Sequence, residues 1–249
     1  MILDNKKHLL ILGCSFTVST YKTFGEVISE KYDLQLHNLG IEGGSNAYII
    51  KKAYEWFTKN KSDIDDTFVI VGWTHPQRRV YWNNKKKEWF NDTNHIHMRD
   101  TDRFKKPFIM NTWTYKERQK FCDNFLNNTY AENNNYMEHI ISLQSFLKNN
   151  KIDYIMFNSL WDMFSDGKSP YQAEMIIDTD WDEIGERPNL NRELWDNFVD
   201  KDTFYLKIFH DMIGEDKSLW YSENDNHPND KSHKLWSERL IKFIEGVYV

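Results

Sequence analysis

Short apolar runs alternate with amphipathic stretches in the first part of the chain. Residues 8–13 form a continuous apolar run that ends at a glycine, which is typical of a strand buried on both faces. Residues 23–32 carry apolar side chains at helical spacing, and residues 34–39 then indicate a second strand that ends at Gly40. The pattern therefore predicts a strand, a helix and a strand in direct succession.

The same alternation continues towards the end of the chain. Ser45 or Asn46 can cap a helix that runs to about Thr58, and residues 68–73 indicate a third strand. The later expected elements are a helix over 137–147, a strand over 152–157 and a terminal helix over 230–246. Alternating strands and helices predict an α/β fold in three layers, in which helices cover both faces of a parallel sheet.

Two long intervals interrupt the alternation. The chain has 249 residues, and no linker rich in Pro, Gly or Ser divides it, so one domain over residues 1–249 is expected. The intervals at about 80–130 and 161–200 are polar, rich in aromatic residues and weakly periodic. We interpret them as insertions that build walls around a site.

The charge balance bears on the choice of partner. The formal net charge is −6, from 32 basic and 38 acidic residues. Such a balance does not favour binding along a phosphate backbone, so no nucleic-acid partner is expected.

Cysteine usage and hydropathy bear on the compartment. Cys14 and Cys122 are too few for a disulfide framework, which favours a reducing environment. No apolar run approaches the roughly 18 residues that span a bilayer, and residues 9–12 are shorter than the apolar core of a secretory signal. Residues 11–14 superficially resemble a bacterial lipoprotein cleavage site, but their apolar region is too short. We expect a cytoplasmic protein with no membrane partner, and the oligomeric state stays open.

Aromatic residues make up 16% of the chain, and ten of them are tryptophans. Most are expected to pack in the core or in loops. Because the faces of indole rings suit the C–H surfaces of sugars, some are expected to face a ligand.

Candidate chemistry gathers after the predicted strands. In open α/β sheets, ligands bind beyond the carboxyl ends of the strands. Ser15 follows the first strand, residues 40–46 follow the second, residues 74–79 follow the third, and Asp225 and His227 precede the terminal helix. A serine nucleophile needs a general base, a group that orients the base, and donors for the oxyanion. These segments contain all of them, which favours a hydrolase.

In order and residue type these segments resemble the motifs of the SGNH, or GDSL-like, hydrolase family. Residues 13–17 (Gly-Cys-Ser-Phe-Thr) match its first block, with Cys14 where Asp is more usual. The match implies Ser15 as the nucleophile and as one oxyanion donor through its N–H. The resemblance covers nearly the whole chain and implies an α/β/α fold with a parallel, flavodoxin-like sheet.

The remaining blocks imply further site residues. Residues 38–45 match the second block and imply an oxyanion donor from Gly43, with Gly44 as the near alternative. Gly72-Trp73-Thr74 stands where the family usually has Gly-x-Asn, so the Thr74 hydroxyl is a candidate third donor, and a donor from elsewhere in the chain is the alternative because the threonine side chain is shorter.

The last block also departs from the usual pattern. Asn224 occupies the position of the usual Asp, three residues before His227, whereas Asp225 stands two residues before it. The resemblance to acetyltransferase-like branches of the family implies that Asp225 orients His227. If Asn224 faces the imidazole instead, the triad becomes a dyad.

The implied activity is ester hydrolysis by Ser15, His227 and Asp225. The expected substrate is a small-molecule or carbohydrate ester, with an O-acetyl group on a carbohydrate as the preferred case. An O-acyltransferase with the same three residues is the first alternative. A degenerate member that binds a glycan or a protein without chemistry is the second, and it predicts a Ser15 hydroxyl out of reach of His227.

Several other residues complete the hypothesis. Asn46 and Arg78 are expected near the substrate. The Arg78 guanidinium would pair with an anionic group of the substrate, although a structural salt bridge of Arg78 is equally compatible. His75 is a second candidate base, and His233 is expected to be solvated or to pack against the core.

No metal and no cofactor are predicted. His95, His97, Asp100 and Asp102 could ligate a metal, but no second cluster accompanies them. Cys14 is expected to lie in the core rather than to act as a thiol.

Overall fold

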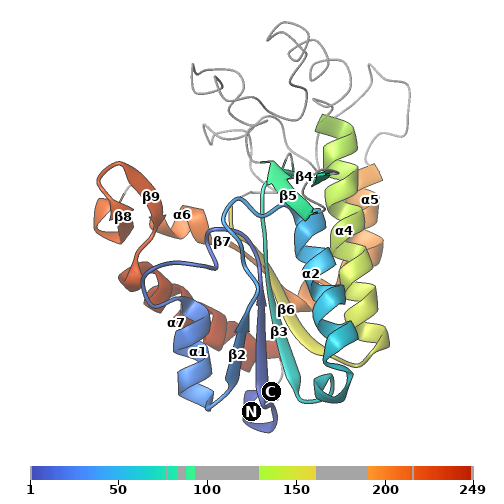
Figure 1. The fold of residues 1–249 in the computed structure, drawn as a ribbon, viewed down its shortest axis with the longest axis horizontal. Helices are drawn as coiled ribbons and strands as arrows, with labels where there is room; N and C mark the ends of the chain where they lie inside the picture. Colours follow the sequence, from blue (N-terminus) through green and yellow to red (C-terminus); the bar gives the residue numbers. More distant parts are fainter. Residues whose placement is uncertain are drawn as a thin grey trace, which may run out of the picture.

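The computed structural model describes residues 2–76, 78–83, 88–92, 129–160, 190–214 and 216–247. At its centre is a parallel sheet of five strands in the order β2-β1-β3-β6-β7 (Figure 1). The strands are β1 (His8–Leu12), β2 (Gln35–Asn38), β3 (Thr67–Trp73), β6 (Asp153–Asn158) and β7 (Phe204–Ile208). The sheet confirms the predicted α/β class and all four predicted strands.

Helices cover both faces of this sheet (Figure 1). One face carries α1 (Phe24–Tyr32) and α7 (Asp230–Val247), and the other carries α2 (Asn46–Lys59), α4 (Thr129–Asn149) and α5 (Leu190–Phe198). Successive residues of a strand point to opposite faces, so Leu10 belongs to the core under α2 and α4, whereas Ile11 belongs to the core under α1 and α7. A strand that is buried on both faces is therefore apolar throughout.

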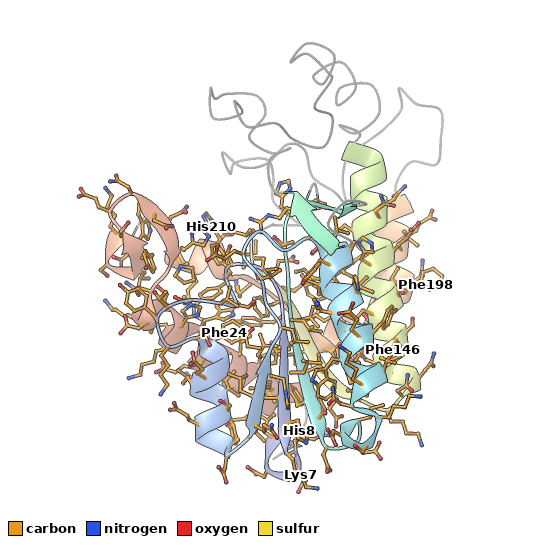
Figure 2. The ribbon with its side chains drawn as sticks, viewed as in Figure 1. Lys7, His8, Phe24, Phe146, Phe198 and His210 are labelled. Atoms are coloured by element: carbon orange, nitrogen blue, oxygen red, sulfur yellow. The ribbon has the colours of Figure 1, made fainter. Side chains whose placement is uncertain are left out.

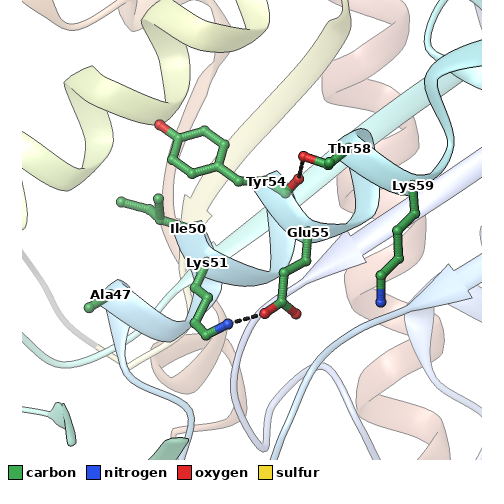
Figure 3. Close-up of a pocket in the computed structure, with 7 residues that line it drawn as sticks. All are labelled: Ala47, Ile50, Lys51, Tyr54, Glu55, Thr58 and Lys59. Carbon is green, nitrogen blue, oxygen red and sulfur yellow. Dashed lines mark hydrogen bonds and ion pairs between the residues drawn. The ribbon is translucent and has the colours of Figure 1, made fainter. Parts of the chain in front are cut away.

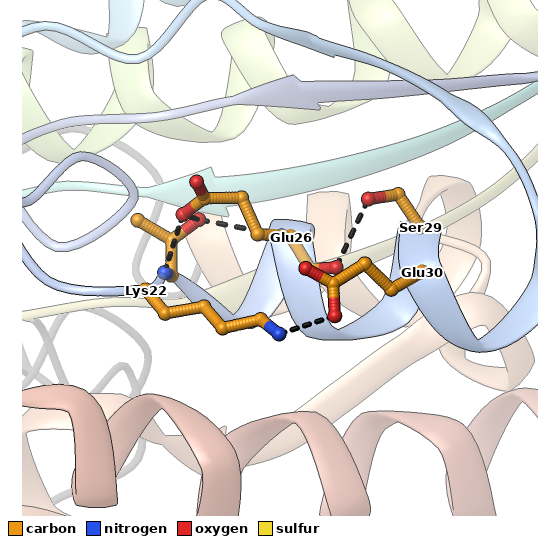
Figure 4. Close-up of polar contacts among 5 residues, drawn as sticks. Lys22, Glu26, Ser29 and Glu30 are labelled. Carbon is orange, nitrogen blue, oxygen red and sulfur yellow. Dashed lines mark hydrogen bonds and ion pairs between the residues drawn. The ribbon is translucent and has the colours of Figure 1, made fainter.

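Side-chain caps explain where two of the helices begin. Thr23 and Glu26 form a capping box at α1, in which the Thr23 N–H donates to Glu26 Oε2 at 2.6 Å and the Glu26 N–H donates to Thr23 Oγ1 at 3.4 Å. Figure 4 labels Glu26 in the first turn of this helix. Ser45 caps α2 by accepting a hydrogen bond from the Tyr48 N–H at 3.3 Å. The expected start of α2 at Ser45 or Asn46 is thus explained by the Ser45 hydroxyl.

The predicted insertions contain more regular structure than their weak periodicity indicated. A hairpin of β4 (Arg79–Asn83) and β5 (Glu88–Asp92) lies in the first, and α5 lies in the second. The predicted helix over 137–147 is also longer, because α4 begins at Thr129. Residues 84–87, 93–128 and 161–189, Cys122 among them, lie outside the described residues.

The carboxyl-terminal third contains elements that the sequence pattern did not reveal. They are β7, α6 (Phe209–Ile213), β8 (Trp220–Ser222) and β9 (Asp225–Pro228). Strand β7 lies at the edge of the sheet, and only Phe204 and Ile208 at its two ends are buried. Such a strand shows neither the continuous apolar run nor the clean alternation that predicts strands. Over the described ranges, no helix is long and apolar enough to cross a membrane.

His233 on α7 is completely buried, so of the two expectations for this residue packing is the correct one. Its ring packs against those of Phe24 and Phe209, with centroid separations of 6.0 and 5.4 Å; Figure 2 labels Phe24. Neither ring nitrogen has a hydrogen-bond partner among the described residues. Burial lowers the pKa of this imidazole to about 4, and the charge of Asp230 offsets the effect only in part.

Replacing this buried imidazole should reduce the pH dependence of stability. The unfolded chain has the ordinary histidine pKa of about 6.5, so it binds the proton before the folded protein does as the pH falls. The stability that the neutral ring contributes is therefore complete above that pKa and is lost as the pH falls towards about 4. Between pH 7 and pH 5, the wild type should lose about 2 kcal/mol more unfolding free energy than His233→Leu in urea titrations.

The comparison isolates His233, because His139, whose pKa burial also lowers to about 4, is present in both proteins. Equal losses of unfolding free energy in the wild type and in His233→Leu would contradict the lowered pKa of His233.

Candidate active site

Ser15 lies in the turn that follows β1, at the carboxyl edge of the sheet. Cys14 beside it is completely buried, as expected for a core residue. The Ser15 hydroxyl oxygen lies 2.9 Å from His227 Nε2. The turn thus presents Ser15 to the histidine and directs Cys14 into the core.

His227 lies on β9, which pairs with β8 in a separate antiparallel hairpin. Its Nδ1 lies 2.6 Å from Asp225 Oδ1, and the same carboxylate oxygen accepts the His227 backbone N–H at 3.0 Å. Asn224 is exposed to solvent. The arrangement is a continuous chain of hydrogen bonds from Asp225 through His227 to Ser15, in which Asp225 takes the orienting position.

The carboxyl of Asp225 has a pKa below its ordinary value. Partial burial raises the pKa, but the side-chain and backbone hydrogen bonds from His227, together with its charge, outweigh burial. Asp225 is therefore a carboxylate at neutral pH, and a carboxylate can stabilise an imidazolium that forms on His227.

Three sets of side-chain contacts hold the hairpin that carries His227. The Phe16 ring packs against the His227 ring with centroids 5.4 Å apart. Asn226 Nδ2 lies 3.1 Å from Nε2 of His210, a residue of α6 that is labelled in Figure 2. The Asn229 side chain donates to the backbone oxygens of Ser218 and Trp220, at 2.9 Å each. The contacts of Phe16 and Asn226 hold β9 beside the main sheet although it is not part of it, and those of Asn229 hold β9 to β8 and the turn before it.

The loop after β2 lies at the same edge. Gly43 has a φ of +68°, a conformation that favours glycine. The N–H of Gly44 donates to the backbone oxygen of Ile41 at 2.9 Å, so this N–H is already engaged. Of the two glycines considered as oxyanion donors, Gly43 is thus the better candidate.

Asn46, which was expected near the substrate, holds the backbone at Thr74 with its side chain. Its side chain is almost fully buried, donates from Nδ2 to the Thr74 oxygen at 3.0 Å and accepts the Thr74 N–H at 2.9 Å. Both polar ends of the amide are therefore used to hold the backbone after β3. The Thr74 hydroxyl is buried and has no hydrogen-bond partner in the part of the chain that the structure describes.

The remaining candidates from the sequence are Arg78, His75 and the possible metal ligands. Arg78 Nη1 donates to the backbone oxygen of Gly44 at 3.4 Å, which links the loops after β3 and β2. His75 is buried. His95, His97, Asp100 and Asp102 lie outside the described residues. Within the described residues, no group of three or more His, Cys, Asp or Glu side chains could hold a metal ion.

Sequence reasoning missed Phe16, Asn226 and His210 as neighbours of the site. The first two are adjacent in sequence to Ser15 and His227, which was the available signal. His210 gave none, because α6 and β7 before it were not predicted.

A groove of about 500 Å³ lies along α2, and its lining includes Ile50, Tyr54 and Lys59 (Figure 3). Lys51 and Glu55 form an ion pair on its wall. Its lining contains neither Ser15 nor His227, so it is separate from the candidate site.

Solved structures of known proteins are similar to this chain in fold. No protein-family model and no curated protein sequence matches the chain. Solved structures do match, and the psychrotrophic esterase EstA from Pseudoalteromonas sp. has a TM-score of 0.51 at 10% identity, over 97% of this chain and 98% of that one. TesA has a TM-score of 0.52 at 9% identity, over 97% and 99%. A protein named for the G-D-S-L lipolytic family, from Desulfitobacterium hafniense DCB-2, has a TM-score of 0.50 at 12% identity, over 96% and 99%.

The parallel sheet with helices on both faces defines an α/β protein. Within that class, the chain has the SGNH hydrolase fold over nearly its whole length. At identities near 10%, these similarities show a shared fold, whereas an activity depends on the residues of the site.

Removing the Asn46 amide should destabilise the protein. Asn46→Ala leaves the buried N–H and oxygen of Thr74 without their partner, and an unpaired buried polar group costs about 1–3 kcal/mol. We expect a loss of about 3 kcal/mol in the free energy of unfolding, measured by urea denaturation. The matched control is Asn150→Ala, whose exposed amide donates to the Phe146 oxygen at 2.8 Å and should cost less than about 1 kcal/mol. Similar losses in both variants would contradict this account.

Proposed function

We propose that the chain is a serine esterase in which Ser15 is the nucleophile, His227 the general base and Asp225 the group that orients the base. The observation that carries the proposal is the chain of hydrogen bonds, with 2.9 Å from Ser15 Oγ to His227 Nε2 and 2.6 Å from His227 Nδ1 to Asp225 Oδ1. Both distances are within the reach that proton transfer requires.

The chemistry follows from these positions. His227 Nε2 accepts the Ser15 proton while Ser15 Oγ attacks the ester carbonyl carbon, and the N–H groups of Ser15 and Gly43 donate to the oxyanion. His227 then gives its proton to the departing alkoxide, which leaves as the alcohol. In the second half, His227 accepts a proton from water, the hydroxide attacks the acyl group, and the carboxylic acid departs as Ser15 regains its proton.

The binding-only alternative requires a Ser15 hydroxyl out of reach of His227, and the 2.9 Å separation argues against it.

The likeness to EstA, a structure described as inhibited by monoethylphosphonate, suggests a phosphonate as the probe for this site. We propose a carbohydrate O-acyl ester as the natural substrate class.

Substituting either reacting residue should abolish activity. Ser15→Ala and His227→Ala should each lower kcat for p-nitrophenyl acetate by at least about 10³-fold, because the nucleophile or its base is gone. Ser15→Ala should also lose covalent labelling by a fluorophosphonate probe. Ser62→Ala, at an exposed position before β3, should behave as the wild type in both assays.

An active, labelled Ser15→Ala would overturn the assignment of the nucleophile. A folded wild type that neither turns over the ester nor reacts with the probe would overturn the proposed function. Acyl transfer to an added alcohol in preference to water would identify a transferase that uses the same residues.

The orienting residue can be tested separately. Asp225→Asn should lower kcat by about 10²–10⁴-fold, since an amide cannot stabilise the imidazolium and favours the wrong tautomer of His227. Asn224→Ala should change kcat by less than about twofold, because Asn224 is exposed and Asp225 makes the contact with Nδ1. The reverse pattern would place the orienting role on Asn224.

A further inference from the structure

The turn that holds Ser15 is closed by Thr17. The Thr17 N–H donates to the Cys14 oxygen at 2.9 Å, and the Thr17 hydroxyl donates to the same oxygen at 2.8 Å. Ser15 and Phe16 are the two central residues of this turn. Two hydrogen bonds to a single carbonyl therefore fix the segment that presents the Ser15 hydroxyl and N–H.

The Thr17 side chain is completely buried among three glycines at the carboxyl edge of the sheet. A Cβ atom on Gly13 would overlap the Thr17 side chain, and one on Gly40 would overlap its hydroxyl oxygen. A Cβ atom on Gly72 would lie 3.2 Å from Thr17 Cγ2. Gly13 and Gly40 follow β1 and β2, and Gly72 belongs to β3, so three neighbouring strands leave the space that this side chain fills.

Thr17 is also connected to the loop that carries Gly43. Its backbone oxygen accepts a hydrogen bond from Asn38 Nδ2 at 2.6 Å, and Asn38 Oδ1 accepts the Gly40 N–H at 3.0 Å. The Ile41 N–H donates to the Gly13 oxygen at 3.3 Å. The turn with the nucleophile and the loop with the proposed oxyanion donor are thus joined through Asn38 and Thr17.

We propose that Thr17 is a positioning residue that sets the Ser15 turn relative to the Gly43 loop. The proposal rests on the esterase function argued above and extends it to a residue that touches no reacting atom. Correct placement of a nucleophile and its oxyanion donors governs the chemical step more than substrate affinity, and a displacement of about 1 Å can cost on the order of 10²-fold in rate.

The test compares two buried threonines at opposite ends of the sheet. Thr17→Val keeps the shape of the side chain and removes the hydrogen bond from the hydroxyl to the Cys14 oxygen, while the bond from the backbone N–H remains. The matched control is Thr67→Val at the start of β3, where an equally buried threonine hydroxyl donates to the Asp63 oxygen at 2.5 Å. Thr17→Ser, which keeps the hydroxyl, is the conservative variant.

For p-nitrophenyl acetate, kcat of Thr17→Val should fall by about 10–100-fold while KM changes by less than about twofold. Thr17→Ser should recover kcat to within about fivefold of the wild type, and Thr67→Val should leave it unchanged within about twofold. Equal kcat values for Thr17→Val and Thr67→Val, at equal folded fractions, would overturn the proposal.

Hydrogen–deuterium exchange supplies a readout that needs no activity. In Thr17→Val, amides of residues 14–18 and 39–45 should exchange about tenfold faster than in Thr67→Val, because the bonds that close the turn are weakened. If the wild type proves inert, the esterase function fails while the exchange rates still decide the role of Thr17, and equal rates overturn it. If Thr17→Val does not fold, Asn38→Ala breaks the same connection, and an unchanged kcat and unchanged exchange in that variant would overturn the proposal.

Discussion

Parallel pairing of β1 with β2 on one side and β3 on the other is the constraint on which the rest of the structure depends. Leu10 of β1 aligns with His37 of β2 and with Val69 of β3, so the three strands run in step. Because parallel strands end at the same edge, the turn with Ser15 and the loops after β2 and β3 meet there. A shift of β1 by one residue would exchange the side chains of its two faces, so the packing of both cores depends on this register.

Hydrogen bonds from side chains to the backbone then convert this edge into a defined site. Asn46 holds Thr74, and Asn38 holds Thr17 and Gly40, at distances of 2.6–3.0 Å. Each bond satisfies backbone groups that no strand or helix pairs, and breaking it would leave them unpaired in a largely buried region. A few amide side chains therefore hold the backbone of the loops at the site.

Two histidines near the start of α7 show how surroundings determine chemistry. His227 contacts a carboxylate and a hydroxyl and is 44% exposed, an arrangement suited to accepting and returning a proton. His233 is completely buried and packs against Phe24 and Phe209, and burial lowers its pKa to about 4. The same side chain thus contacts polar partners at one position, and at the other it is held neutral by burial.

The sequence by itself determined the α/β class, four strands of the sheet, the helices α1, α2, α4 and α7, and Ser15, Asp225 and His227 as candidates, because periodicity and turn residues are local properties of the chain. Only the tertiary structure decided that Asp225 and not Asn224 contacts the imidazole, and that Asn46 holds Thr74 across 28 residues of sequence. It also decided that β7 completes the sheet, since burial at only two positions leaves no pattern to find. The contact between Ser15 and His227 joins residues 212 positions apart, and a distance of that kind exists only once the strands have paired and the hairpin has packed against them.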